Sequence, residues 1–139
     1  MSNKIREIMT QHPVTVQSNT SALDAARTMR ESNIGCLAVM RDGKLDGVVT
    51  DRDLVVRVMA KGLDPSSTKL ENVYSREIAS LSPTSTTDEA VRLMREKSIR
   101  RIPVVDDGSI IGMVSLGDLA VALDPQSALA DISKASPNL

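Results

Sequence analysis

The chain has 139 residues, a net charge of −1 and a single aromatic side chain, Tyr74, and this length suits one domain or two small modules that share a core. The 17 basic and 18 acidic residues are interspersed, which argues against a nucleic-acid binder and a polybasic membrane anchor. A single cysteine excludes an internal disulfide, and no stretch has the apolar length of a signal peptide or a membrane span, so we expect a cytoplasmic protein.

The first half of the chain has the pattern of a β-α-β-β-α unit. Its helix-start signal at 21–24 precedes apolar residues at helical spacing, and its Asp-Gly pair at 42–43 is typical of a tight hairpin turn. The expected elements are an extended stretch at 14–16, a helix beginning near Ser21, strands at 37–40 and 45–49, and a second helix that opens at Thr50.

The second half repeats this order after a turn-rich linker at 61–67. A capping box at 86–89 predicts the start of its first helix. The remaining elements are an extended stretch at 79–81, strands at 102–105 and 110–114 joined by a turn at 107–108, and a helix that opens at Ser115. The tail from Asp124 onward is polar and rich in small residues, and we expect at most a short helix there.

The two halves are copies of one unit. A shift of 65 positions superimposes 9–54 on 74–119 without a gap, with identities in the helix, the turn and the strands. Each copy alone buries too little apolar surface, so we expect an α/β fold in which both pack as one pseudo-two-fold body. The predicted boundaries are 8–64 for the first repeat, 73–129 for the second and 130–139 for a polar tail.

One phrase appears in both copies, GVVTDRDL at 47–54 and GMVSLGDL at 112–119. Its hydroxyl and aspartate, three residues apart at a helix start, are typical of a capping box. The same carboxylate could accept hydrogen bonds from the vicinal hydroxyls of a ribose, with the helix start favouring a phosphate. The glycines at 47 and 112 would let a ligand or another backbone come close.

The doubled pattern resembles a tandem pair of CBS domains, also called a Bateman module. The resemblance rests on IREIMTQHPVTV, ALDAARTMRESNIGCLAVM and GKLDGVVTDRDL, then on ENVYSREIASLS, DEAVRLMREKSIRRIPVVDDG and GMVSLGDL. It covers about nine-tenths of the chain and is similar to small stand-alone bacterial proteins, some linked to stress or hypoxia. It implies two sites between the halves for an adenosine-containing ligand, AMP, ADP, ATP or S-adenosylmethionine.

The resemblance also implies which residues bind. Asp53 and Asp118 match the ribose-binding aspartates, and Thr50 and Ser115 match the hydroxyl residues beside them. The walls around the base match the early extended segments and the starts of the second strands: Val14, Thr15, Val16, Leu37 and Ala38 in the first copy, Ala79, Ser80, Leu81, Ile102 and Pro103 in the second. Ala38 stands where the family usually has proline.

The copies differ in charge near these positions. Arg100 and Arg101 precede the strand of the second copy, where the first has Gly35 and Cys36, and Arg52 stands where the second has Gly117. Arginine side chains suit phosphates, so the two sites are expected to differ in ligand preference or occupancy. The alternative is that Arg100 and Arg101 are solvated charges. With one aromatic residue in the chain, adenine would lie between aliphatic side chains and be read by backbone amides.

Catalysis and a metal site are not predicted. His12 is the only histidine, Cys36 has no evident base partner, and the glycine-rich motifs of nucleotide-binding folds are absent from the sequence. The leading hypothesis is therefore a non-catalytic sensor that requires no cofactor, binds the adenosyl ligand and signals to an unknown effector protein. The family implies a homodimer formed through the helices. The alternative hypothesis is a dimeric scaffold with no physiological nucleotide; a nucleic-acid or membrane partner is not favoured.

Overall fold

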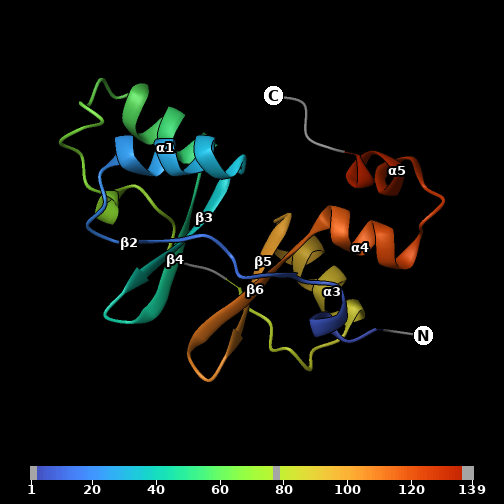
Figure 1. Cartoon of the computed structure of the whole chain (residues 1–139). Helices are drawn as coiled ribbons and strands as arrows, with labels where there is room; N and C mark the ends of the chain where they lie inside the picture. The colour runs from blue at the N-terminus through green and yellow to red at the C-terminus, as the bar shows by residue number, and fades with distance from the viewer. Residues whose placement is uncertain (1–2, 77–78, 136–139) are drawn as a thin grey trace. The chain divides into compact units, whose positions relative to one another are not determined.

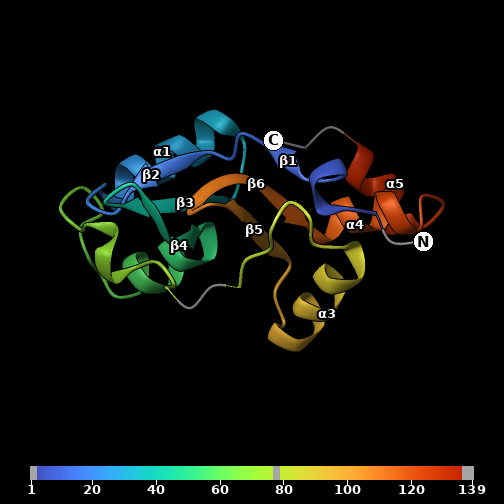
Figure 2. The same ribbon diagram turned by 90° about the horizontal axis from the view of Figure 1, so that it is seen from below.

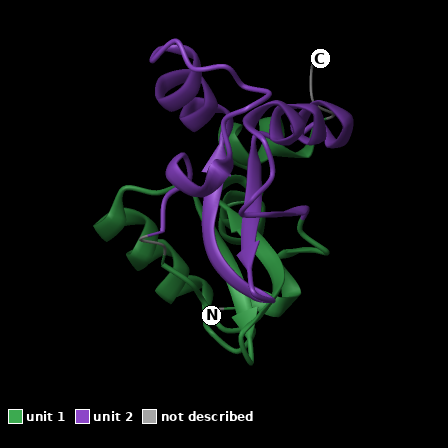
Figure 3. Cartoon of the chain, turned by 90° about the vertical axis from the view of Figure 1, so that its left-hand side faces the viewer, with its two compact units in different colours: residues 1–13, 79–139 green, residues 14–78 purple. Residues whose placement is uncertain are grey.

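A computed structural model describes residues 3–76 and 79–135, which form two compact units (Figures 1 and 3). Unit 2 contains residues 14–78, and unit 1 contains residues 1–13 together with 79–139. The helices and strands of unit 2 are β2 (Thr15–Gln17), α1 (Ala22–Ser32), β3 (Cys36–Arg41), β4 (Lys44–Thr50), α2 (Asp51–Leu54), the π-helical turn η2 (Val55–Met59) and the 3₁₀ turn η3 (Leu70–Asn72). Those of unit 1 are the 3₁₀ turn η1 (Ile5–Glu7), β1 (Thr10–Gln11), α3 (Thr87–Lys97), β5 (Arg101–Asp106), β6 (Ser109–Ser115), α4 (Leu116–Leu123) and α5 (Ala128–Lys134).

Unit 2 is built on the three-stranded sheet β2-β3-β4. Strand β2 pairs with β3 in parallel, with α1 as the connection, and β3 pairs with β4 in an antiparallel hairpin. The hairpin turns at Asp42 and Gly43, whose φ angles of 52° and 78° are those of a type I′ turn. Buried aliphatic side chains of α1 and the strands pack with Leu70, Val73 and Tyr74 to form the core.

Unit 1 repeats this plan with the sheet β1-β6-β5. Leu81 forms a parallel bridge with Val104 of β5, at the position that β2 occupies in unit 2. The hairpin between β5 and β6 turns at residues 107–108, both at positive φ. Helix α5 lies beside α4 in Figure 2, so the predicted short helix of the tail is confirmed. It begins two residues before the predicted boundary of the tail at 130, while residues 136–139 lie outside the described part of the chain.

The packing units are offset from the repeats of the sequence. The start of the first repeat belongs to unit 1, where Thr10 of β1 pairs with Met113 of β6, and Ile5, just before the predicted boundary, is fully buried there as well. The start of the second repeat belongs to unit 2, where Ser75 forms an antiparallel bridge with Val48 of β4. The boundaries 8–64 and 73–129 thus remain predictions for the repeats, whereas each core is completed by a segment from the neighbouring repeat.

The helix-start signals have the expected geometry, with one difference. Ser21 and Thr86 act as the N-caps of α1 and α3, and the Thr86 hydroxyl accepts a hydrogen bond from the Glu89 N–H at 3.3 Å. This is the hydroxyl half of the predicted box at 86–89. The reciprocal bond, from the N-cap N–H to the acidic side chain three residues later, is formed at the second helices, which open at Thr50 and Ser115 as predicted.

Candidate functional site

The sheet of unit 2 brings the candidate residues of the first repeat together. Thr15 pairs with Ala38 across β2 and β3, and the Ala38 N–H donates to the Val14 carbonyl at 3.1 Å. On the other side of β3, Leu37 pairs with Val49, so Thr50 and the start of α2 follow directly at the end of β4. The early extended segment, the start of the second strand and the hydroxyl–aspartate pair therefore lie at one end of three neighbouring strands.

Unit 1 brings the equivalent residues together in the same way. The Leu81 N–H donates to the Pro103 carbonyl at 3.0 Å, and the Val105 N–H donates to the Leu81 carbonyl at 2.8 Å. Arg101 pairs with Ser115 across β5 and β6. The duplication seen in the sequence is thus also a duplication of local geometry.

The two aspartates form complete capping boxes. Asp53 Oδ2 accepts from the Thr50 N–H at 2.9 Å, and the Thr50 hydroxyl accepts from the Asp53 N–H at 3.1 Å. Asp118 and Ser115 make the same two bonds at the same two distances. One oxygen of each carboxylate is therefore turned to its own main chain, where it accepts one bond, while the other oxygen takes no part in the cap.

The second oxygen differs between the copies. Asp53 Oδ1 lies 3.7 Å from Arg57 Nε, and the Arg57 guanidinium also donates to the Val73 carbonyl at 3.0 Å. In the second copy Ala122 stands where the first has Arg57, so no side chain at this position restrains the Asp118 carboxylate. The two aspartates have the same cap and a different neighbour, a contrast that the local motif alone did not reveal.

Burial determines which atoms of the candidate walls could reach a ligand. Leu37, Ala38 and Ile102 are fully buried, backbone included, and Leu37 and Ile102 belong to the cores of their own units, so these three residues present no exposed atom to a ligand. Pro103 and Leu81 are buried as well. The exposed or half-buried candidates are Val14, Thr15, Val16, Thr50, Asp53, Ala79, Ser80, Ser115 and Asp118.

The three candidate arginines are exposed, and they do not occupy equivalent places. Arg52 lies in the first turn of α2, and its counterpart Gly117 packs against α5, where a side chain would come within 2.6 Å of Ser133 Oγ. Arg101 begins β5, whereas Arg100 lines a groove between α3 and α4. The small residue at 117 is thus explained by the docking of the tail helix.

The glycines of the doubled phrase accommodate the chain itself. A methyl group at Gly47 would collide with the Ser75 carbonyl and the Tyr74 ring, and one at Gly112 would lie 2.9 Å from the Thr10 carbonyl. Of the two predicted reasons for these glycines, close approach of another backbone is the one observed. Tyr74 and Met9 occupy equivalent positions, 65 residues apart. In both copies the glycine therefore makes room for a segment that comes from the other repeat.

A polar cluster that was not predicted reinforces this contact in unit 2. The Tyr74 hydroxyl donates to Asp46 Oδ2, and Arg41 Nε and Arg76 Nε each lie 3.5 Å from the same oxygen. The Arg76 guanidinium also lies 5.4 Å from the centre of the Tyr74 ring. Ile111 stands at the position equivalent to Asp46, so this cluster belongs to one copy alone.

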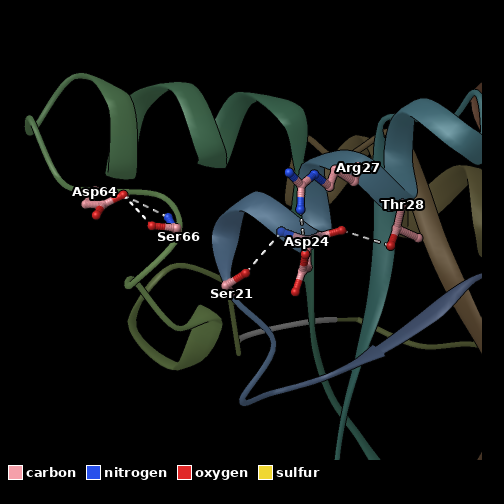
Figure 4. A network of polar contacts seen from close by, with 6 residues as sticks. All are labelled: Ser21, Asp24, Arg27, Thr28, Asp64 and Ser66. Atoms are coloured by element: carbon pink, nitrogen blue, oxygen red, sulfur yellow. Dashed lines mark hydrogen bonds and ion pairs between the residues drawn. The ribbon is translucent and has the colours of Figure 1, made fainter.

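The linker between the repeats docks on the start of α1 (Figure 4). The Ala22 and Leu23 N–H groups, which a helix start leaves without intrahelical partners, donate to the Thr68 and Pro65 carbonyls. Within the linker, Asp64 Oδ1 accepts from the Ser66 hydroxyl at 2.8 Å and from the Ser66 N–H at 3.0 Å. These bonds hold the pKa of the Asp64 carboxyl below its ordinary value.

The described part of the chain holds neither a candidate metal cluster nor a membrane-spanning helix. Between residues 3 and 76 and between 79 and 135, histidine, cysteine and acidic side chains form no group of three that could hold a metal ion. In the same part of the chain, every helix is too short or too polar to cross a bilayer.

Comparison with known proteins defines the family. The CBS domain model matches residues 5–60 and 70–125. The CBS domain-containing protein YhcV of Bacillus subtilis is 38% identical over 119 residues, which is 86% of this chain and 84% of YhcV. Hypoxic response protein 1 of Mycobacterium tuberculosis is 32% identical over 94% of this chain and 91% of its own. The chain spans only 61% and 54% of two longer relatives.

Solved structures agree with this assignment. A CBS-domain protein of Burkholderia ambifaria, whose name assigns it provisionally to signal transduction, superimposes with a TM-score of 0.81 and 29% identity over 90% of this chain and 96% of its own. Stand-alone proteins built from such repeats are of the regulatory or signal-transduction type. The chain belongs to the CBS-domain family and carries two CBS repeats.

Proposed function

We propose that this protein is a non-catalytic sensor that binds an adenosine-containing ligand, AMP, ADP, ATP or S-adenosylmethionine, at one site in each repeat. The observation that carries the proposal is the geometry of Asp53 and Asp118. Each carboxylate is oriented by a capping box through Oδ2, next to the strand ends that carry the other candidate residues. A carboxylate oriented in this way can accept hydrogen bonds from both hydroxyls of a ribose.

The walls beside each carboxylate suit an adenine without an aromatic partner. Val14 and Val16 are half-buried aliphatic side chains in the first repeat. At the equivalent positions of the second repeat, Ala79 is half-buried and Leu81 is buried in the core of unit 1. Backbone amides of the exposed or half-buried candidates would read the edge of the base, because Leu37 and Ile102 are fully buried in the cores. Hydrophobic walls with few polar groups are typical of small-molecule sites.

The ligand-dependent change of conformation would be transmitted through contacts of the protein surface with a partner. A ligand shifts a conformational balance only by its difference in affinity between the states, and the output would pass to an effector protein or to a second copy. We propose a homodimer, which is supported by apolar side chains that the second helices leave exposed, among them Val55, Met59 and Leu123.

A thermal-shift screen tests the sensor proposal. The wild-type chain is expected to gain melting temperature with at least one of the four ligands, since a ligand that prefers the native state stabilises it. Asp53→Ala and Asp118→Ala should each reduce that gain. Asp88→Ala is the matched control, because Asp88 is an exposed acid in the first turn of α3, far from both capping boxes in sequence.

A specific observation also favours the second candidate, a scaffold without a nucleotide. Both aspartates already have a structural use, since each closes a capping box through one oxygen. If capping is their whole purpose, each alanine variant should lose about 0.5–2 kcal/mol of stability, and the screen should give no ligand-dependent shift in the wild type. Such a result would reject the sensor and favour the scaffold.

A further inference from the structure

Helix α5 occupies a stretch of sequence that forms no helix in the first repeat. Its residues stand 65 positions after those of the linker that docks on α1. In unit 2 the linker serves the start of α1, whose Ala22 N–H donates to the Thr68 carbonyl at 2.8 Å. In unit 1 the equivalent bond, from the Thr87 N–H at the start of α3, goes to the Asn3 carbonyl at 2.9 Å. The segment after α4 is therefore not needed at the start of α3, and it folds as a separate helix.

Helix α5 packs on the first turn of α4, and both helices belong to unit 1 (Figure 2). A Cβ atom at Gly117 would lie 2.6 Å from Ser133 Oγ and 3.7 Å from Ser115 Oγ. The last turn of α5 thus lies beside the hydroxyl group that caps α4 and belongs to the second candidate site. In the first repeat Arg52 takes the place of Gly117 and is exposed. The first turn of the second helix is therefore open at one candidate site and covered at the other.

The contact that holds α5 in place is small. Ala130 is fully buried, whereas Leu129 and Ile132 are 43% and 71% exposed. Ala130 lies outside the aliphatic core of unit 1, so α5 can leave α4 without opening that core. A helix of this length is unstable by itself in water, and elements with few buried contacts open more easily than a core does.

Charge alone does not distinguish the two candidate sites, because each has an exposed arginine. Arg101 pairs with Ser115 across β5 and β6, and Arg52 follows Thr50 in the first repeat. Either guanidinium suits a phosphate. The sites differ instead in the room beside the hydroxyl residue, which Ser133 of α5 takes in the second repeat.

We infer that α5 sets the ligand class of the second site. While α5 is docked, this site admits the nucleoside part of an adenosyl ligand and excludes a chain of phosphates, whereas the first site has no such cover. The inference rests on the proposed function and adds a selectivity to one of its two sites. Docked α5 and a bound phosphate chain compete for the same space, so each lowers the affinity of the other.

Titration calorimetry of the full chain with adenosine and ATP tests the inference. An Asp53→Ala background weakens the first site, so that the second is measured, and this chain should bind adenosine more tightly than ATP by about tenfold or more. Ala130→Asp places a charge in the buried contact, and Asp131→Pro breaks α5 in its interior. Each should raise the ATP affinity by about tenfold and leave the adenosine affinity unchanged. One variant adds an acid and the other removes one, so a shared gain cannot come from charge.

Ile132→Asp is the matched control. It adds the same charge as Ala130→Asp to the same helix, but at a side chain that is 71% exposed. Both affinities should remain those of the Asp53→Ala chain. Hydrogen exchange of the α5 amides should become faster in Ala130→Asp and Asp131→Pro and stay unchanged in Ile132→Asp.

Three results would count against the inference. Equal affinities for adenosine and ATP in the Asp53→Ala chain would overturn it while the sensor proposal stands, as would an ATP affinity that stays low in both variants that release α5. If the wild type binds neither adenosine nor ATP nor S-adenosylmethionine, the sensor proposal fails and the inference fails with it. Circular dichroism verifies the fold of each variant, and Asp131→Pro decides alone if Ala130→Asp does not fold.

Discussion

At the scale of single residues, the same short motif closes a capping box in each repeat and, under the proposed function, also binds the ligand. The hydroxyl–aspartate pair at a helix start was recognisable in the sequence because its spacing matches a capping box, and both boxes are formed. The need for glycine at 47 and 112 was also predictable. Close approach of another backbone was one of the two predicted causes, but the approaching segments were not predictable, since Ser75 and Thr10 reach these glycines only in the folded chain.

Substitution of Gly47 tests this cause. Gly47→Ala should destabilise the protein by about 1–3 kcal/mol, a typical cost of overpacking a core, because the Ser75 carbonyl belongs to the backbone and cannot move aside. Gly112→Ala should cost less, since part of its contact is with the flexible Met9 side chain. Gly35→Ala is the control, where only the exposed Asp51 side chain has to give way. Urea unfolding measures all three, and an equal loss in Gly47→Ala and Gly35→Ala would contradict the account.

Asp64 provides a prediction about pH. Hydrogen bonds from the Ser66 hydroxyl and then the Ser66 N–H lower its pKa in the folded protein. A folded-state pKa below the unfolded value means that these bonds add stability above the unfolded pKa of about 3.9, and that this contribution is lost as the pH falls through the folded pKa. An NMR titration should find the pKa of Asp64 below its ordinary value and higher in Ser66→Ala. An unchanged value in the variant would reject this origin.

At the scale of elements, alternation and turn chemistry predicted most helices and strands, including both type I′ hairpins. Two features could not be predicted because they depend on tertiary contacts. The short strand β1 exists only through its pairing with β6. The helix from Asp51 widens into the π turn η2, in which the Ala60 N–H bonds to the Val55 carbonyl. The residues of the candidate sites were predicted from the family resemblance, whereas the Arg57 contact to Asp53 was not predicted.

Arg57, in the π turn η2, contacts both the Asp53 carboxylate and the Val73 carbonyl. Arg57→Met keeps the aliphatic stem and removes the bond to the Val73 carbonyl, so we expect a loss of about 0.5–1.5 kcal/mol in stability. Arg52→Met, an exposed position five residues earlier, should change stability by less than about 0.5 kcal/mol. Thermal and urea unfolding compare them, and equal effects would show that the bond to Val73 contributes nothing.

At the scale of the whole molecule, the repeats of the sequence do not coincide with the two compact units of the structure. The repeat was visible as a shift of 65 residues, yet the cores are completed by exchanged segments, since Ile5 is buried in unit 1 and Leu70 and Tyr74 are buried in unit 2. Such an exchange cannot be detected in the sequence, because the exchanged segments have the same hydrophobic pattern whichever of the two sheets they join. The groove between α3 and α4 could not be predicted from the sequence either, since it forms only where the two helices pack together.

Fragments of the chain distinguish the repeat from the packing unit. Residues 14–78 contain all of the core of unit 2, whereas the predicted repeat 8–64 lacks its buried residues Leu70, Val73 and Tyr74. Loss of several buried side chains exceeds the stability of a small domain. Circular dichroism and hydrogen exchange should therefore find more helix and protection in fragment 14–78. Equal helix and protection in fragment 8–64 would contradict the assignment.

The central claim is that Asp53 and Asp118 bind the hydroxyls of a ribose. Titration calorimetry with the ligand found in the screen and with its 2′,3′-dideoxy analogue tests it, on the wild type and on Asp53→Ala/Asp118→Ala. The wild type should bind the ribose form more tightly by about 1–3 kcal/mol, the value of hydrogen bonds to a charged group, and the double variant should bind both forms equally. A preference for the ribose form that persists undiminished in the double variant would contradict the claim.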